Sequence, residues 1–170
     1  MGKKKQKNND KTNVMRILDQ HHLVYEHYQV SPTTDLADIT NGVTMARLMN
    51  QNPDHVFKTL VTIGKSKQHY VFMIPVAAEL DLKKAATAVG EKSIAMIKAK
   101  ELEPLTGYVH GGCSPIGMKK IFETVIDETA ELYDTIIFSA GKVGYQVEMS
   151  LDTLKQVVPV KMNNLTFEQL

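Results

Sequence analysis

The sequence contains one cysteine, no tryptophan and no apolar run long enough to span a membrane. The single thiol, Cys113, cannot form a disulfide within the chain, and no Cys/His cluster has the spacing of a zinc site. The first residues also lack the apolar segment of a signal peptide. Together these features predict a protein of the reducing cytoplasm that has no membrane partner.

Common catalytic and cofactor motifs are missing as well. The chain has no phosphate-binding P-loop, no dinucleotide fingerprint, no G-x-S-x-G nucleophile motif and no H-E-x-x-H zinc motif. We therefore expect neither a metal ion nor a cofactor.

Charge is distributed unevenly along the chain. The formal net charge is +1, but five lysines against one aspartate give the first eleven residues +4, which leaves −3 for the rest. We expect residues 1–10 to form a basic, disordered, solubilising arm, with nonspecific contact to RNA phosphates as the alternative. Residues 11–170 suit a single globular domain with its own core, because the chain is 43% hydrophobic. That domain is not a strongly basic nucleic-acid binder.

Hydrophobic periodicity and turn residues predict short helices mixed with short strands. A helix capped by Thr12 should end near His21, and a second capped by Asp81 should end at Gly90. Further helical segments are expected at 45–49, 98–104 and from Ser150 on, and residues 31–41 are expected to be a polar loop. Strands are expected at 23–30, 54–63, 69–74, 93–97, 121–126, 135–139, 145–149 and 159–162, with 54–63 and 69–74 forming a hairpin. Without a regular βαβ repeat, this order predicts an α+β domain with a mixed, curved sheet.

The stretch from Gly107 to Gly117 is the most unusual in the chain, because it contains four glycines and Pro115 within eleven residues. Adjacent glycines remove side chains and allow positive φ, so that bare backbone N–H groups can face a ligand. Such a loop can hold an oxyanion or a phosphate, or it can simply be a tight connection between two elements.

Lys58 stands between Val56 and Leu60 on a strand that reads as apolar on both faces. Its ammonium must either reach water at a rim or project into a polar pocket. In a pocket it could hold a phosphate or polarise a carbonyl, and partial desolvation would lower its pKa.

Other candidate residues carry weaker signals. Tyr28 reads as a half-buried aromatic side chain, and Cys113 would need a neighbouring base to act as a nucleophile. The carboxylates Asp127, Glu128 and Glu131 read as a solvated acidic face.

Six motifs in a fixed order resemble the YbaK/EbsC family of Cys-tRNA(Pro) deacylases, and the similarity runs from about Lys11 to Val160. The motifs are Val56-Phe57-Lys58-Thr59-Leu60, Asp81-Leu82-Lys83-Lys84, Gly107-Tyr108, Gly111-Gly112-Cys113-Ser114-Pro115-Ile116-Gly117, Lys119-Lys120 and Gly141-Lys142-Val143-Gly144. The resemblance implies a mixed sheet in a pseudo-barrel with flanking helices, as in the editing domain of prolyl-tRNA synthetases. It also implies hydrolysis of the ester that joins a wrongly attached amino acid to tRNA(Pro), with tRNA(Pro) and prolyl-tRNA synthetase as partners.

The resemblance also assigns roles to residues. Lys58 and Gly111 match the family's essential lysine and the glycine whose N–H is held to stabilise the oxyanion. The residues expected to bind substrate are Tyr28, Gly112, Ser114, Pro115 and Gln146. Some relatives carry an aspartate where this chain has Gln146, and glutamine cannot act as a carboxylate base.

The family's mechanism needs no protein nucleophile, because the thiol of the substrate cysteine attacks its own ester and leaves as a thiolactone. Cys113 is then expected to pack against the core. Two alternatives stay open: deacylation of tRNA(Pro) that carries another small aminoacyl group such as alanine, and a non-catalytic module that binds tRNA or the synthetase.

Overall fold

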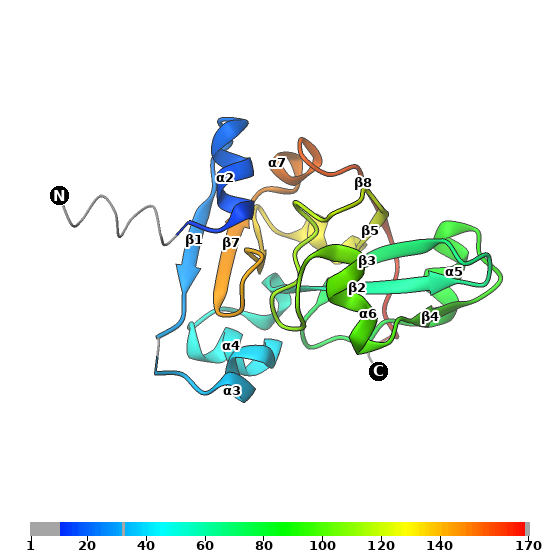
Figure 1. Ribbon diagram of the computed structural model, residues 1–170, viewed down its shortest axis with the longest axis horizontal. Coiled ribbons are helices and arrows are strands. Elements are labelled where there is room, and N and C mark those ends of the chain that lie inside the picture. The colour runs from blue at the N-terminus through cyan, green and yellow to red at the C-terminus, as the bar shows by residue number, and fades with distance from the viewer. Residues whose placement is uncertain (1–10, 32, 169–170) are drawn as a thin grey trace.

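The computed structural model describes residues 11–31 and 33–168, and Figure 1 shows their arrangement. The helical elements are α2 (Asn13–Gln20), α3 (Leu36–Thr40), α4 (Gly42–Leu48), η1 (Pro53–His55), α5 (Leu82–Val89), α6 (Ala99–Thr106), η2 (Glu128–Leu132) and α7 (Leu151–Lys155). The strands are β1 (Glu26–Gln29), β2 (Phe57–Gly64), β3 (His69–Pro75), β4 (Ile94–Met96), β5 (Glu123–Asp127), β6 (Ile136–Ser139), β7 (Tyr145–Met149) and β8 (Val160–Asn163). The expected basic arm, residues 1–10, lies outside the described residues.

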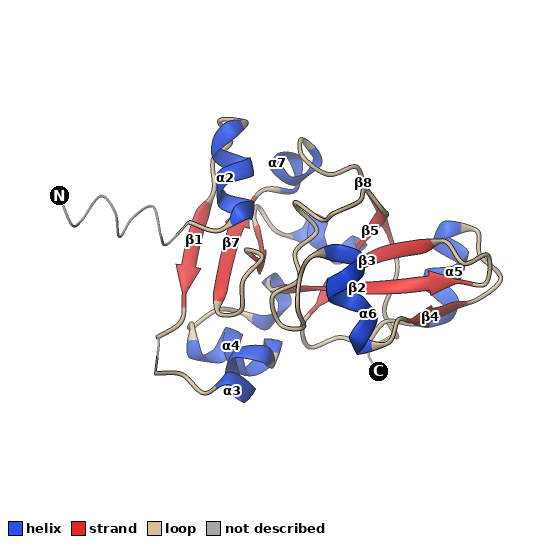
Figure 2. Cartoon of the chain, in the orientation of Figure 1, coloured by secondary structure: helices blue, strands red, loops and turns tan. Residues whose placement is uncertain are grey.

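The strands form two sheets that meet at one point. The five-stranded sheet has the order β4-β2-β3-β5-β8, and the three-stranded sheet has the order β1-β7-β6. Pairing is antiparallel for β2 with β3 and β4, but parallel for β3 with β5 and for β5 with β8. A parallel bridge between Val56 and Ile137 joins the sheets. Figure 2 shows strands of both sheets in red. The α+β class with a mixed, curved sheet is therefore confirmed, and the described strands leave the barrel open because β1 and β8 are not paired with each other.

The helices cover both faces of the five-stranded sheet. On one face Phe57 and Val61 belong to the largest core cluster, together with residues of α2, β6, β7 and α7. On the other face Phe72 and Ile74 pack with Ala85 of α5. This alternation along β2 and β3 follows from strands whose two faces are both apolar, and it confirms the predicted hairpin.

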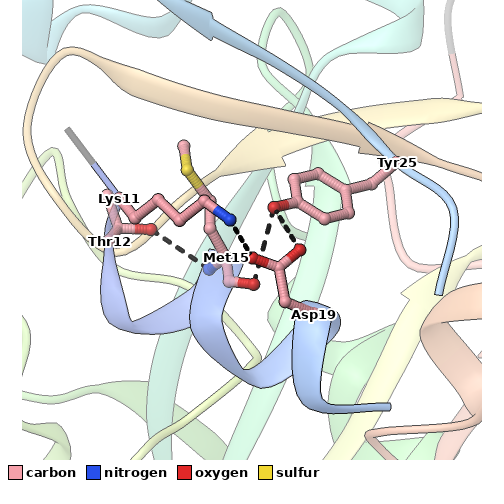
Figure 3. A network of polar contacts seen from close by, with 5 residues as sticks. All are labelled: Lys11, Thr12, Met15, Asp19 and Tyr25. Atoms are coloured by element: carbon pink, nitrogen blue, oxygen red, sulfur yellow. Dashed lines mark hydrogen bonds and ion pairs between the residues drawn. The ribbon is translucent and has the colours of Figure 1, made fainter. Parts of the chain in front are cut away.

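Local capping explains where α2 begins and how it is tied to β1. The Thr12 side chain accepts a hydrogen bond from the Met15 amide, as the sequence predicts for an N-cap. Asp19 pairs with Lys11 and accepts a hydrogen bond of 2.9 Å from the Tyr25 hydroxyl (Figure 3). The hydrogen bond from Lys11 holds the pKa of Asp19 below its ordinary value, while burial and then the bond to Asp19 raise the pKa of Tyr25 to about 12.

Two expectations from the sequence are wrong. Residues 31–41 contain the short helix α3, which the polar composition of that stretch concealed. Asp127 is 1% exposed, not solvated, because its carboxylate accepts hydrogen bonds from Thr129 and from the Leu165 amide. Glu128 and Glu131 are exposed, as expected.

None of the helices in the described ranges combines the length and the apolar character needed to cross a lipid bilayer.

Candidate active site

A cavity of about 170 Å³ lies where the two sheets meet, and the elements that border it can be followed in Figure 1. It is bounded by the first half of β2, the α3–α4 segment, the glycine-rich loop and the β6–β7 pair. The lining residues are Ile39, Thr40, Gly42, Met45, Val56, Phe57, Lys58, Thr59, Leu60, Val76, Leu102, His110, Gly111, Cys113, Phe138, Ser139, Tyr145 and Gln146. Apolar walls with a few polar groups are typical of a small-ligand site.

Lys58 lines this cavity from β2. Burial lowers the pKa of its ammonium, and the charge of Glu79 opposes that effect only in part. The ammonium makes no hydrogen bond or ion pair with another residue of the described chain. A half-buried cation without a protein partner is available to a negatively charged or strongly polar ligand.

Gly111 brings bare backbone to the same cavity. Its φ is +83°, and a Cβ placed there would lie 2.7 Å from the Cγ2 atom of Thr40 in α3. Only glycine fits both the left-handed conformation and the close approach. The Gly111 amide forms no hydrogen bond within the part of the chain that the structure describes, so its N–H can serve a ligand.

Internal hydrogen bonds hold the glycine-rich loop in shape. The Tyr108 hydroxyl donates to the Ile116 carbonyl at 2.6 Å, and the Lys119 amide donates to the Thr106 carbonyl at 3.1 Å. Tyr108 is buried, and this burial raises the pKa of its hydroxyl. The loop is therefore fixed before any ligand binds, which is what an oxyanion site requires.

Gln146 also lines the cavity, from β7, and is only 4% exposed. Its Oε1 atom accepts a hydrogen bond of 2.7 Å from the Nε2 atom of Gln51. Lys58, Gly111 and Gln146, which are far apart in the sequence, thus share one cavity.

The other four residues expected to bind substrate do not line the cavity. Tyr28 lies opposite Gln146 in the pairing of β1 with β7, but its hydroxyl donates to Glu148. That hydrogen bond, with burial, raises the pKa of Tyr28 to about 12.

The remaining three belong to the interior of the glycine-rich loop. The Gly112 amide donates to the Val109 carbonyl at 3.0 Å, and a Cβ on Gly112 would lie 2.9 Å from the Val143 nitrogen. The Ser114 hydroxyl accepts from the Ile116 amide at 3.3 Å, and Pro115 borders a separate hollow. Their contacts shape the loop.

Cys113 reaches the cavity wall but belongs to the main core cluster, as expected. Burial raises the pKa of its thiol to about 12, so the thiol is protonated at neutral pH. It does not have the character of a nucleophile.

Several lining residues were not singled out as site residues in the sequence. The Oγ1 atom of Thr59, next to Lys58 on β2, is buried without a hydrogen-bond partner. Ile39 and Met45 form the wall contributed by α3 and α4. The α3 contribution was missed because that helix was not expected, and Thr59 could have been suggested only by its place beside Lys58.

Residues 11–31 and 33–168 contain no cluster of three or more His, Cys, Asp or Glu side chains that could hold a metal ion. The polar side chains that line the cavity are one lysine, one histidine, one glutamine, one tyrosine and the hydroxyls of Thr40, Thr59 and Ser139.

Comparisons with known proteins agree with this geometry. The model of the aminoacyl-tRNA editing domain family matches residues 38–157. A protein of Enterococcus faecalis named "Putative Cys-tRNA(Pro)/Cys-tRNA(Cys) deacylase EbsC" is 39% identical over 165 residues, which cover 97% of this chain and 99% of that protein.

Solved structures share the fold. A crystal structure titled "putative trans-editing enzyme for prolyl tRNA synthetase" superposes with a TM-score of 0.77 at 20% identity, covering 91% of this chain and 95% of the other. The crystal structure of a hypothetical protein superposes with a TM-score of 0.81 at 18% identity, covering 92% of this chain and all of the other. At these identities the likeness concerns the fold alone.

Proposed function

The chain belongs to the aminoacyl-tRNA editing domain family, and on that premise we propose that it is a trans-editing deacylase that removes cysteine from tRNA(Pro). Membership confirms the resemblance inferred from the ordered sequence motifs. The observation that carries the proposal is that the unpaired ammonium of Lys58 and the unpaired amide of Gly111 border one small cavity.

The reaction assigned to this cavity is cleavage of the ester between the amino acid and the 3′-terminal adenosine. The thiol sulfur of the substrate cysteine attacks the ester carbonyl carbon, a C–S bond forms, and negative charge develops on the carbonyl oxygen. The C–O bond to the ribose then breaks, the ribose oxygen takes the proton given up by the thiol, and a thiolactone leaves. Lys58 and the Gly111 N–H stabilise the developing charge.

The chemistry of Cys113 supports a substrate thiol over a protein thiol. A buried thiol with a pKa of about 12 supplies almost no thiolate at neutral pH. The thiol group of the substrate, held against its own carbonyl, gains instead from the proximity of an intramolecular reaction.

The size of the cavity supports a small aminoacyl group as the part that enters. Its 170 Å³ lies well below the roughly 300–1,000 Å³ of sites that enclose drug-sized ligands. The adenosine must then lie at the mouth and not inside. When two substrates differ by one small group, a pocket discriminates between their kcat/KM values by only about 10–200-fold. Alanine is therefore the alternative to cysteine.

Selection of the tRNA requires more than the charge of this domain. Outside its first eleven residues the chain has a net charge of −3, which gives little attraction to RNA phosphates. We propose that prolyl-tRNA synthetase supplies that selectivity in a complex. A module that binds the synthetase or tRNA without catalysis is the alternative from a different functional class.

A deacylation assay with purified protein tests the proposal. The substrates are Cys-tRNA(Pro), Ala-tRNA(Pro) and Cys-tRNA(Cys), each with and without prolyl-tRNA synthetase. We expect fastest release of cysteine from tRNA(Pro), and a further increase when the synthetase is present. Release of alanine alone would assign the alanine alternative, and no release from any substrate would leave the binding module.

A further inference from the structure

Gln51 is the only described residue that forms a hydrogen bond with the Gln146 side chain, although the two lie 95 residues apart. It stands between α4 and η1, and its backbone amide donates to the Ala46 carbonyl at 2.8 Å. Its Nε2 atom donates to the Gln146 Oε1 atom at 2.7 Å. The contact therefore joins the α4 segment to β7 at the wall of the cavity.

The two side-chain amides meet in one orientation in the structure. As placed, one atom is left over, the Oε1 atom of Gln51, which is buried without a partner. Turning both amides around would put an NH₂ group in that position and leave two N–H donors buried without partners. In the orientation of the structure the Gln146 oxygen is the atom that meets the Gln51 NH₂ group.

The NH₂ group of Gln146 has no partner among the described residues. The oxygen of the same amide is occupied by Gln51, and the Nε2 atom donates to no residue in the described part of the chain. The side chain of Gln146 is only 4% exposed, and it borders the cavity. The N–H donors of Gln146 are thus the groups left for a ligand.

Resting on the proposed function, we propose that Gln51 is a positioning residue that holds the Gln146 amide with its N–H donors toward the aminoacyl end of the substrate. The cavity then presents the Lys58 ammonium, the Gly111 N–H and the Gln146 N–H, which are all donors. That set of donors complements the ester and the neighbouring ribose, because the oxygens of both can accept hydrogen bonds. The carbonyl oxygen of the ester also gains negative charge during the reaction.

Kinetics of four variants test the role of Gln51. Gln51→Met keeps the length of the side chain but removes the NH₂ donor. Gln51→Glu replaces this donor with a carboxylate, which is an acceptor at pH 8. Gln146→Met removes the amide that Gln51 is proposed to position. The fourth is the double variant Gln51→Met/Gln146→Met. The control is Gln68→Met, an exposed glutamine in the turn between β2 and β3.

We expect Gln51→Met to lower kcat/KM for Cys-tRNA(Pro) by about three- to tenfold, the usual worth of one hydrogen bond. Gln51→Glu should lower it further, because Gln146 must turn its N–H groups toward the new carboxylate and its oxygen toward the substrate. In the Gln146→Met background, Gln51→Met should have no further effect on kcat/KM. Equal losses from Gln51→Met in both backgrounds, or no loss in either, would overturn the proposal.

A binding experiment keeps this test separate from that of the proposed function. The ¹⁵N-labelled Gln146 side-chain amide is observed by NMR while an amide-linked, non-hydrolysable cysteinyl-adenosine analogue is added. We expect its signals to shift in the wild type and to shift much less in Gln51→Glu. Unchanged Gln146 signals in a wild type that binds the analogue and hydrolyses Cys-tRNA(Pro) would refute the role of Gln51 while leaving deacylation in place. A shift without turnover would refute deacylation alone.

Discussion

Replacing Lys58 tests the electrostatic part of the proposal most directly. An ammonium about 4 Å from a developing oxyanion contributes about 4 kcal/mol at the effective dielectric constant of a partly exposed site. Lys58 is half-buried and makes no ion pair within the described residues. The effective dielectric constant of a partly exposed site therefore applies to it, and not the lower value of a dry interior. Since about 1.4 kcal/mol corresponds to a factor of ten, Lys58→Ala should lower kcat by roughly 10³-fold.

Single-turnover deacylation of Cys-tRNA(Pro) measures this loss free of product release. Lys58→Met keeps the aliphatic stem and should lose as much activity as Lys58→Ala, which separates the charge from the packing of the side chain. Lys65→Ala is the matched control, because Lys65 is an exposed lysine at the end of the same hairpin. A loss of less than tenfold in Lys58→Met, or an equal loss in Lys65→Ala, would refute the reasoning.

The pH dependence of the wild type provides a second readout of the same group. Burial lowers the pKa of Lys58 from its ordinary value of 10.5, so the ammonium is lost at a lower pH than in a free lysine. Activity should rise with pH while the thiol of the substrate ionises, and it should fall once pH passes the lowered pKa at which Lys58 loses its ammonium. Folding stability should move the other way, because between the lowered pKa and 10.5 the unfolded chain binds more protons than the folded one. A rate that rises through this range, after subtraction of spontaneous hydrolysis, would contradict the role of the ammonium.

Three further substitutions have defined outcomes. Gly111→Ala should lower both the melting temperature and turnover, because positive φ costs about 1–3 kcal/mol for other residues and the new Cβ would lie 2.7 Å from Thr40; an unchanged melting curve would contradict that contact. Cys113→Ala should cost about 1 kcal/mol of unfolding free energy but keep most single-turnover activity, and a dead variant would sink the substrate-assisted mechanism. Asp127→Ala should lower the unfolding free energy in urea by roughly 2–4 kcal/mol, because it leaves the buried Leu165 amide without its acceptor; its kcat/KM should match the wild type, since Asp127 does not line the cavity.

Much of the fold could be predicted from the sequence, because its signals are local. The hairpin of β2 and β3 follows from two apolar strands around a Gly-Lys-Ser-Lys turn, and α5 follows from Asp81 before it and Gly90 after it. By contrast, α3 has five residues and no buried side chain, so hydrophobic periodicity gives no signal there.

The site could be predicted only in part, because its contacts join distant segments. Lys58 is recognisable as a charge on an apolar strand, and Gly111 by its glycine-rich surroundings. The contact of Gln51 with Gln146, by contrast, joins residues that lie 95 positions apart in the chain. Such pairs leave no periodic pattern in the sequence.

The α3–α4 segment forms one wall of the cavity, and within it α3 has no buried residue. Substitutions at Ile39 or Met45 should alter the room available to the amino acid, and neither residue belongs to the strand that carries the ammonium. We therefore expect the choice of amino acid to change through this one short segment while the ammonium on β2 keeps its place.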